Sequence, residues 1–491
     1  MTQLLGIDIG TSACKVAVFD TEGHVLASAN KSYKVYYPNS GWVEQDADEW
    51  WAAICTAIRE VLSHDSVIAK DIAGIGVDGQ SWSAIPVDAE GNALARTPIW
   101  MDTRADEICT RIKDSLGSER IFNIAGNDFL PSYSTPKMIW FKQNYPEIFN
   151  KTAYFMQSNS YIVYKLTGIF SQDMSQGYGI HFFNMNTLKY DSELAAELGL
   201  STNLVPELYD CDSVVGAVTA EASSLTGLPT GIPVVAGGLD AACGTLGAGV
   251  FRVGQTQEQG GQAGGMSICT DTALSHPKLI LSPHVVPGKW LLQGGTVGGG
   301  GALKWFKEKL MPEASFDEIT AEAAAIAPGS DGVIFLPYMA GERSPIWNPD
   351  AKGVFYGLSF DKTRGHMVRA LLEGVAMSLY HNLLVAEDVG ANVDVLSAMG
   401  GAANSVLWTQ IKADITGHTI EVPTSDTATT LGAAILAGIG SKVYSSYDEA
   451  VKRTIVITRT QEPDMANHEI YKSVMEQYLK LSKTLEPMFT K

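Results

Sequence analysis

The sequence predicts an α/β protein made of two halves of similar size. Runs of branched apolar residues alternate with longer stretches whose apolar residues recur at helical spacing, and this pattern occurs in both halves. A glycine-rich segment at 244–265 lies between the halves. The chain has 491 residues and 45% hydrophobic content, enough to build at least two cores. We therefore expect one domain over residues 1–246 and a second over residues 247–491.

The expected elements follow in chain order. In the first half we expect a strand pair at 4–9 and 16–19, a helix at 45–64, a strand at 72–79, several helices, and an apolar strand at 232–238. In the second half we expect strands at 289–295, 331–338 and 393–401, a helix at 364–388, and helices at 405–417 and 429–440.

Charge and cysteine content exclude several classes of protein. The net charge of −19 leaves no diffuse basic surface for nucleic acid or for an anionic membrane. The six cysteines form no Cys-x-x-Cys pair, and the N-terminus carries no signal-peptide pattern, so we expect a reduced, cytoplasmic location. The longest apolar stretches fall short of the roughly 20 residues that span a bilayer.

The stretch "GIGVDG" at 74–79 matches the dinucleotide-binding pattern only by letter. That fold needs a helix directly after the glycine turn, whereas "QSWSAIPVD" follows here as extended chain with Pro86. The Walker A pattern is absent. A nucleotide would have to be held in another way.

The bend between the first two strands is a candidate phosphate hairpin. Gly10, Thr11 and Ser12 offer backbone and hydroxyl donors to phosphate oxygens, and Asp8 could hold Mg²⁺ through water. An ordinary β-turn is the alternative. Three further glycine-rich corners follow apolar strands, at 234–249, 291–305 and 396–408, which favours a ligand approached by backbone from several sides.

Asp240 in "GGLDAACG" is a candidate general base. A carboxylate at the end of a strand, beside a phosphate-binding cleft, can accept a hydroxyl proton as that oxygen attacks a γ-phosphoryl group. The alternative is a helix N-cap, which is common for an aspartate after a glycine pair.

Seven motifs resemble the FGGY carbohydrate kinases of the actin and hexokinase-like superfamily, a group that includes xylulose, ribulose and glycerol kinases. They cover essentially the whole chain: "GIDIGTSACKVAVFD", "PIWMDTRA", "SQDMSQG", "GGLDAACGTLGAG", "GERSPIWNPDAKGVFYGL", "MVRALLEGVAMSL" and "MGGAANSVLWTQIKADITG". The resemblance implies two ribonuclease H-like (actin-like ATPase) domains that close on a catalytic cleft. It also implies that the first domain holds mainly sugar and the second mainly ATP, with Mg²⁺.

The resemblance also implies roles for individual residues. Asp240 becomes the catalytic base, and Asp8, Gly10, Thr11 and Ser12 become the first phosphate loop. The implied nucleotide-binding residues are Gly295, Thr296, Gly299 and Trp305 in one corner and Gly400, Gly401 and Asn404 in the other. The implied sugar-binding residues are Gln80, Ser81, Trp82, Trp100, Asp102 and Asp240, although Trp82 could equally be a core residue.

Two departures from the family pattern affect these expectations. Gln80-Ser81-Trp82 replaces the Gln-Met-His of xylulose kinases, and the Arg-Glu pair of glycerol kinases is absent. The second phosphate loop, typically Gly-Thr-Ser-Gly, aligns with residues 261–264, where Gln262 and Gly264 remain as phosphate donors without hydroxyl groups.

The expected function is ATP-dependent phosphorylation of a small ketose or polyol, with a pentulose such as xylulose as the first choice. One alternative is a sugar-binding regulatory protein that kept the fold and lost most catalysis, which the altered second loop would explain. A filament-forming ATPase is a third class. Gly244, Gly247 and Gly249 could serve either as hinge positions or in tight helix packing. Dimers are common in the family, so a homodimer stays open.

Overall fold

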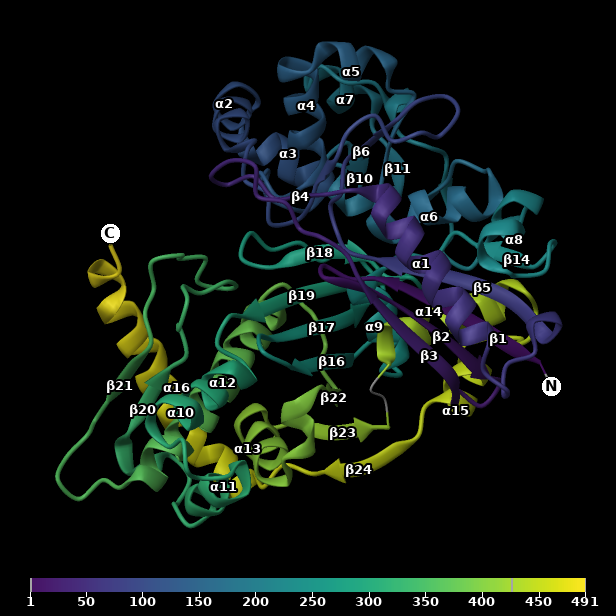
Figure 1. Cartoon of the computed structure of the whole chain (residues 1–491). Coiled ribbons are helices and arrows are strands. Elements are labelled where there is room, and N and C mark those ends of the chain that lie inside the picture. The colour runs from purple at the N-terminus through teal and green to yellow at the C-terminus, as the bar shows by residue number, and fades with distance from the viewer. Residues whose placement is uncertain (1, 425–426, 491) are drawn as a thin grey trace.

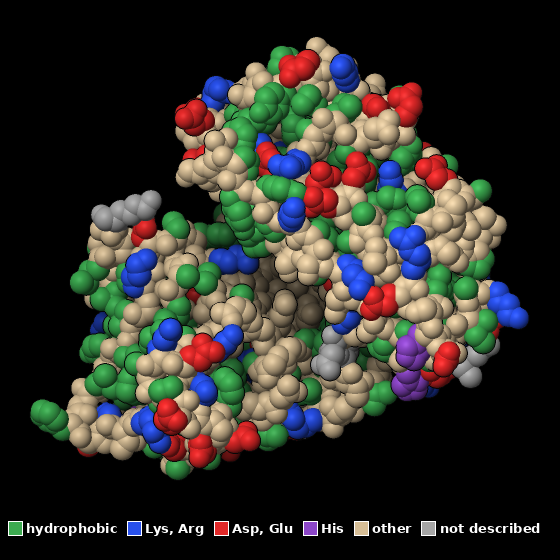
Figure 2. All heavy atoms as spheres, in the orientation of Figure 1, with side chains coloured by type: hydrophobic (Ala, Val, Ile, Leu, Met, Phe, Trp, Pro, Cys, Tyr) green, Lys and Arg blue, Asp and Glu red, His purple; other side chains and the backbone are tan. Residues whose placement is uncertain are grey.

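The computed structural model describes residues 2–424 and 427–490 as two lobes, each built on a seven-stranded mixed sheet (Figure 1). This confirms the predicted α/β fold with two sheet-containing halves. Figure 2 shows the surface hollowed between the lobes. No helix in the described part of the chain has the length and apolar character needed to cross a membrane.

The first lobe is centred on a seven-stranded sheet whose middle strands are β5, β1 and β2. Strands β1 and β2 form the predicted antiparallel hairpin, and β1 pairs in parallel with β5. The sheet contains, in spatial order, β13 (Val214–Ala217), β14 (Pro233–Val235), β5 (Ile72–Gly79), β1 (Gln3–Ile9), β2 (Ala13–Asp20) and β3 (Val25–Ser32), with β15 (Gly238–Leu239) also beside β5. The leucine, isoleucine, valine and phenylalanine residues of β1, β2 and β5 are buried, as their sequence predicts.

Helix α1 (Ala47–Leu62) shows how the local sequence sets these elements. The Asp46 side chain caps it by accepting the Asp48 amide N–H, and its apolar face buries Trp50, Ile54 and Ile58 in the core shared with β1 and β2. The other helices of this lobe are α2 (Asp106–Leu116), α3 (Ser118–Ala125), α4 (Ser134–Asn144), α5 (Pro146–Lys151), α6 (Ser158–Thr167), α7 (Ser192–Glu197), α8 (Ala220–Thr226) and α9 (Asp240–Gly247). Short two-stranded pairs are β4 (Glu44–Gln45) with β7 (Thr97–Pro98), β6 (Ile85–Val87) with β8 (Tyr154–Met156), β9 (Gln172–Asp173) with β12 (Leu208–Tyr209), and β10 (Phe183–Asn184) with β11 (Lys189–Tyr190).

The second lobe repeats the plan. Its sheet contains, in order, β18 (Ile280–Pro283), β19 (Trp290–Thr296), β17 (Gly264–Thr270), β16 (Gln255–Gly260), β22 (Val395–Met399), β23 (Thr419–Pro423) and β24 (Ile457–Gln461). Its helices are α10 (Gly300–Leu310), α11 (Phe316–Ala324), α12 (Arg364–Glu387), α13 (Val406–Thr416) and α16 (Met465–Leu485). The strand expected at 331–338 is only β20 (Ile334–Leu336), which pairs with β21 (Val354–Tyr356) outside the main sheet.

Helix α14 (Ala428–Gly440) comes from the second half of the chain but packs on the first lobe. It lies against β1, β5 and α9, and its apolar residues share a core with Leu4 and Phe19. Helix α15 (Tyr447–Thr454) follows it there before β24 returns to the second sheet. The division of the chain at residues 246 and 247 stays a prediction, and the first lobe's core also draws on residues 428–454.

Glycines allow this close approach between the halves. A Cβ at Gly76 or at Gly432 would lie 1.9 Å from a carbonyl oxygen, that of Ala433 or of Cys243. Gly247 is packed in the same way, 1.9 Å from the Ala428 carbonyl oxygen. Tight packing is therefore the role that the structure gives Gly247, whereas Gly249 has a φ of 83° just after α9, where other residues are strained.

Candidate active site

Three carboxylates come together where the first sheet meets the cleft. Asp8 on β1 is in parallel register with Asp78 on β5, and β15 pairs with the same end of β5. Asp240 directly follows β15 as the first residue of α9. Sheet pairing thus collects on one edge three side chains that lie far apart in sequence.

The environment of Asp240 fits a general base. Its carboxylate accepts the neighbouring Ala241 amide N–H at 2.6 Å, and Leu239, not Asp240, occupies the N-cap position. The N-cap alternative is therefore wrong. Burial, reinforced by the charge of Asp8, raises the pKa of Asp240 to about 7. The group thus changes protonation in the range where a base is most useful.

Asp78 is the member of this cluster that the sequence analysis missed. It is fully buried, and burial together with the charges of Asp8 and Asp240 raises its pKa well above the usual range. The pKa of Asp8 is raised by burial too, although hydrogen bonds with Asp78 and Thr429 oppose the shift. The available signal was an aspartate inside the otherwise apolar strand "IAGIGVDG".

The predicted phosphate hairpin is held firmly in place. Tyr33 donates its hydroxyl hydrogen to the Gly10 carbonyl, and Gln45 donates to the Thr11 carbonyl at 2.7 Å. The Trp100 indole N–H donates to the Thr11 hydroxyl oxygen at 3.0 Å. The exposed Ser12 stays open to solvent at the tip. Two of these bonds hold carbonyl oxygens of the hairpin, and the third holds the Thr11 hydroxyl group.

Several residues expected to bind sugar have structural partners instead. Gln80 is buried and donates to the Gln45 side chain at 2.6 Å, which in turn holds the hairpin. Both carboxylate oxygens of the buried Asp102 are bound, to Arg104 and to the Val43 amide. These side chains support the pocket. Their direct contact with sugar, expected from the resemblance, stays a prediction.

Trp82 is a core residue. Only 7% of it is exposed, and its ring stacks on Tyr133 with centroids 4.2 Å apart and an interplanar angle of 27°. Of the two alternatives for Trp82, the structure favours the core position. Ser81, Trp100 and Asp240 are only partly buried, so they remain the sugar-side residues that a ligand could reach.

In the second lobe, three glycine-rich corners pack against one another. A Cβ at Gly299 would lie 2.4 Å from the Ala263 carbonyl carbon, and one at Gly400 would lie 2.9 Å from the Gly260 carbonyl oxygen. A Cβ at Gly264 would meet Thr296 at 2.7 Å. Two of the predicted glycine-rich corners, 291–305 and 396–408, thus lie against the second phosphate loop, because no larger residue fits at the contacts.

The polar groups of two predicted nucleotide residues are already occupied. Thr296 donates to Glu342 at 2.7 Å, and the Gly295 amide donates to Ser344 at 2.6 Å. Beneath the corners, Lys412 forms a buried ion pair with Glu258 at 2.6 Å. These contacts hold the end of β19 and the floor of the site in place.

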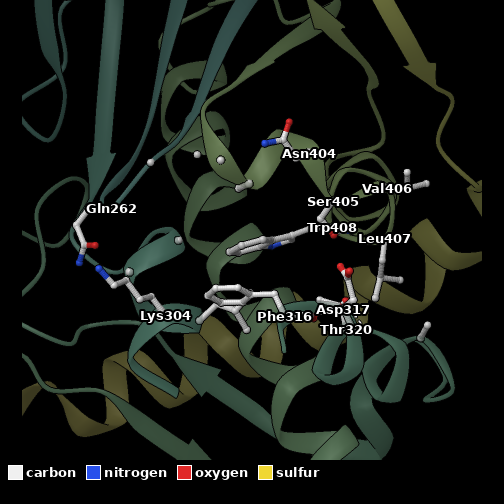
Figure 3. Close-up of a pocket in the computed structure, with 18 of the residues that line it drawn as sticks. Gln262, Lys304, Phe316, Asp317, Thr320, Asn404, Ser405, Val406, Leu407 and Trp408 are labelled. Atoms are coloured by element: carbon white, nitrogen blue, oxygen red, sulfur yellow. Dashed lines mark hydrogen bonds between the residues drawn. The ribbon is translucent and has the colours of Figure 1, made fainter. Parts of the chain in front are cut away.

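A cavity of about 750 Å³ opens beside these corners (Figure 3). Gly401 and Asn404 line it as expected, together with Gln262 of the second phosphate loop. Trp305 does not line it. That residue packs against the core of the second lobe.

Helices α11 and α13 supply the part of the cavity that the sequence analysis did not predict. The side chains of Phe316 and Trp408 face it, with Asp317 and Thr320 nearby (Figure 3). Phe316 is 47% exposed at the first position of α11. An apolar residue at a helix start was the available signal, and nothing in the sequence set it apart from an ordinary surface position.

Comparison with known proteins agrees with this arrangement. The family model for the N-terminal domain of the FGGY carbohydrate kinases matches residues 3–247, and the model for the C-terminal domain matches residues 266–441. A xylulose kinase from Staphylococcus epidermidis is 32% identical, with 98% of this chain and 97% of that protein covered. The crystal structure of a xylulose kinase from Rhodospirillum rubrum superposes with a TM-score of 0.92 at 31% identity, over 100% of both chains. A gluconokinase from Bacillus licheniformis is 28% identical, with 100% of this chain and 97% of that protein covered. Matched along both lobes, this chain belongs to the FGGY family of carbohydrate kinases.

Proposed function

We propose that this sugar kinase transfers the γ-phosphoryl group of ATP to a hydroxyl group of a pentulose, with xylulose as the first candidate. The observation that supports it most is Asp240, whose carboxylate lies at the cleft edge of the first sheet with a pKa near 7. The xylulose kinases among its full-length relatives support the choice of sugar. A gluconokinase among the relatives makes an aldonate the competing substrate class.

The chemistry is mostly positioning. The sugar hydroxyl has to lie in line with the γ-phosphorus. Asp240 accepts its proton as the new oxygen–phosphorus bond forms, and the bond from the γ-phosphorus to the leaving ADP breaks. In the phosphate hairpin the Gly10 amide donates to the Ala13 carbonyl at 3.1 Å, so the donors for phosphate oxygens from the first lobe are those of Thr11 and Ser12. In the second lobe, the cavity beside Phe316 and Trp408 offers an apolar surface to the adenine ring of ATP.

Mg²⁺ fits the residues present. It usually keeps several waters and needs only one or two carboxylates besides substrate phosphates. Asp8 would hold it through water, since its side chain is partly exposed and hydrogen-bonded on one side to Thr429 at 3.1 Å. When bound, the ion supplies charge neutralisation at the phosphate oxygens.

A coupled ADP-release assay over a panel of sugars tests this function. The panel should contain xylulose, ribulose, xylitol, gluconate, glycerol and glucose, each with Mg²⁺-ATP. We expect kcat/KM to be highest with a ketopentose. A preference for gluconate would make an aldonate, and not a pentulose, the substrate. If no compound of the panel caused ADP release, the sugar-binding regulatory alternative would be favoured.

A further inference from the structure

The second phosphate loop, residues 260–265, offers few side-chain donors. Gln262 carries its one polar side chain, and in the described part of the chain this amide makes no hydrogen bond. The side chain lies against the start of α10, because a Cβ at Gly301 would come within 2.2 Å of its Nε2 atom. The loop therefore presents one uncommitted amide to the cavity.

The first turn of α10 does not make up for the missing hydroxyl groups. The Gly300 amide donates to the Gly261 carbonyl at 2.7 Å, and the Gly301 amide donates to the Gln262 carbonyl at 3.0 Å. These two donors, which at many helix N-termini face a phosphate group, are used up by the loop itself. With these two amides used, a further donor from the first turn of α10 has to come from a side chain.

Lys304 is the side chain in position to do so. It lies one turn into α10, and among the described residues that line the cavity it is the one cation. Figure 3 shows Lys304 and Gln262 at one end of the cavity, Val406 and Leu407 at the other, and the rings of Phe316 and Trp408 between them.

The ammonium group of Lys304 is available. Its carboxylate neighbour Glu308 is 3.9 Å away, and both side chains are more than half exposed, so this pairing is weak. Lys412, a second cation near the loop, is buried in its ion pair with Glu258. In a chain with a net charge of −19, an uncommitted cation at a cavity end is well suited to an anionic ligand.

We infer that Lys304, together with the Gln262 amide, binds the phosphate chain of the nucleotide and takes over the role of the hydroxyl groups missing from the second phosphate loop. This inference rests on the proposed function, because that function places the adenine ring of ATP at the Phe316 and Trp408 end of the same cavity. An ammonium group donates charge-assisted hydrogen bonds to phosphate oxygens, which are stronger than those of a hydroxyl group.

Calorimetric titration with adenosine, ADP and Mg²⁺-ATP tests the assignment. We expect Lys304→Met to weaken ADP and Mg²⁺-ATP binding by about tenfold or more, as the loss of a charge-assisted contact implies, with adenosine affinity unchanged. Lys304→Arg should restore most of the loss. Lys307→Met is the matched control, because Lys307 lies on the same helix but outside the cavity, with its Nζ 3.3 Å from the Pro312 carbonyl.

The outcomes separate the inference from the function on which it rests. Equal ADP affinity in Lys304→Met and Lys307→Met would overturn the role of Lys304 while leaving the kinase assignment intact. An equal loss of affinity for adenosine and for ADP would overturn the role of Lys304 as well, because the side chain would then act on the fold or on adenine binding. A wild-type protein that binds neither adenosine nor Mg²⁺-ATP would contradict the proposed function itself.

Discussion

Asp240 is the side chain to which the proposed function assigns the proton transfer. Its position at the start of α9 keeps the carboxylate at the cleft edge, and burial beside Asp8 gives it a pKa of about 7. The residue itself could be predicted from "GGLDAACG", because a carboxylate after a strand and a glycine pair is a recognisable pattern. Its pKa could not, because the shift depends on burial and on Asp8, 232 positions earlier in the chain.

The raised pKa predicts the pH dependence of catalysis. Asp240 accepts a proton only when ionised, so kcat should increase as the pH rises from 6 to 8, with an apparent pKa near 7. Initial rates at saturating sugar and ATP across this range would measure it. A flat profile between pH 5 and 8 would contradict the assignment of Asp240 as the base.

The same shift predicts an effect on stability. The pKa of Asp240 is higher in the folded chain than its ordinary value of 3.8, so the folded state binds this proton more tightly. The free energy of unfolding should therefore decrease as the pH rises from about 4 through 7 on account of this group. Asp240→Asn removes the contribution, and denaturant melts should show the variant gaining stability over wild type at pH 8 but not at pH 4. An equal difference at both pH values would speak against the buried, raised-pKa state.

At the scale of elements, most helices and strands follow the sequence pattern, whereas the pairing between distant segments does not. The helix predicted at 364–388 is α12 (Arg364–Glu387), and the hairpin of β1 and β2 is present as expected. The strand predicted at 331–338 is present but shorter, as β20 (Ile334–Leu336), and its residues pack on α12 outside the main sheet. The packing of α14 on the first lobe depends on glycines in three separate segments of the chain. No local sequence pattern predicts this contact.

The close packing of α14 against α9 predicts how a substitution at Gly432 affects stability. Gly432→Ala places a Cβ 1.9 Å from the Cys243 carbonyl oxygen, which α9 and α14 can relieve only by moving apart. We expect the variant to lose about 1–3 kcal/mol of stability, the usual cost of overpacking. Gly401→Ala is the control, since a Cβ there has no neighbour within 4 Å. Chemical denaturation of both variants gives the comparison, and equal stability would contradict the close packing.

At the scale of the whole molecule, the proposed function divides the reaction between the two lobes. The first brings Asp8, Asp240 and the phosphate hairpin to the cleft, and the second brings the cavity lined by Phe316 and Trp408. The two-lobed α/β plan could be predicted from the sequence. So could the glycine-rich corners at 291–305 and 396–408. The supporting roles of Gln80 and Asp102 could not, because they depend on partners contributed by Gln45 and Val43.

The most direct test of the central claim is phosphorus-31 NMR of the enzyme with Mg²⁺-ATP and xylulose, run in parallel with Asp240→Asn. The account predicts that the γ-phosphate signal is replaced by a sugar phosphomonoester signal. It further predicts that the variant forms this product about 10²- to 10⁴-fold more slowly, as expected for the loss of a general base. Inorganic phosphate as the main product, or an equal rate of sugar phosphate formation in the variant, would contradict it.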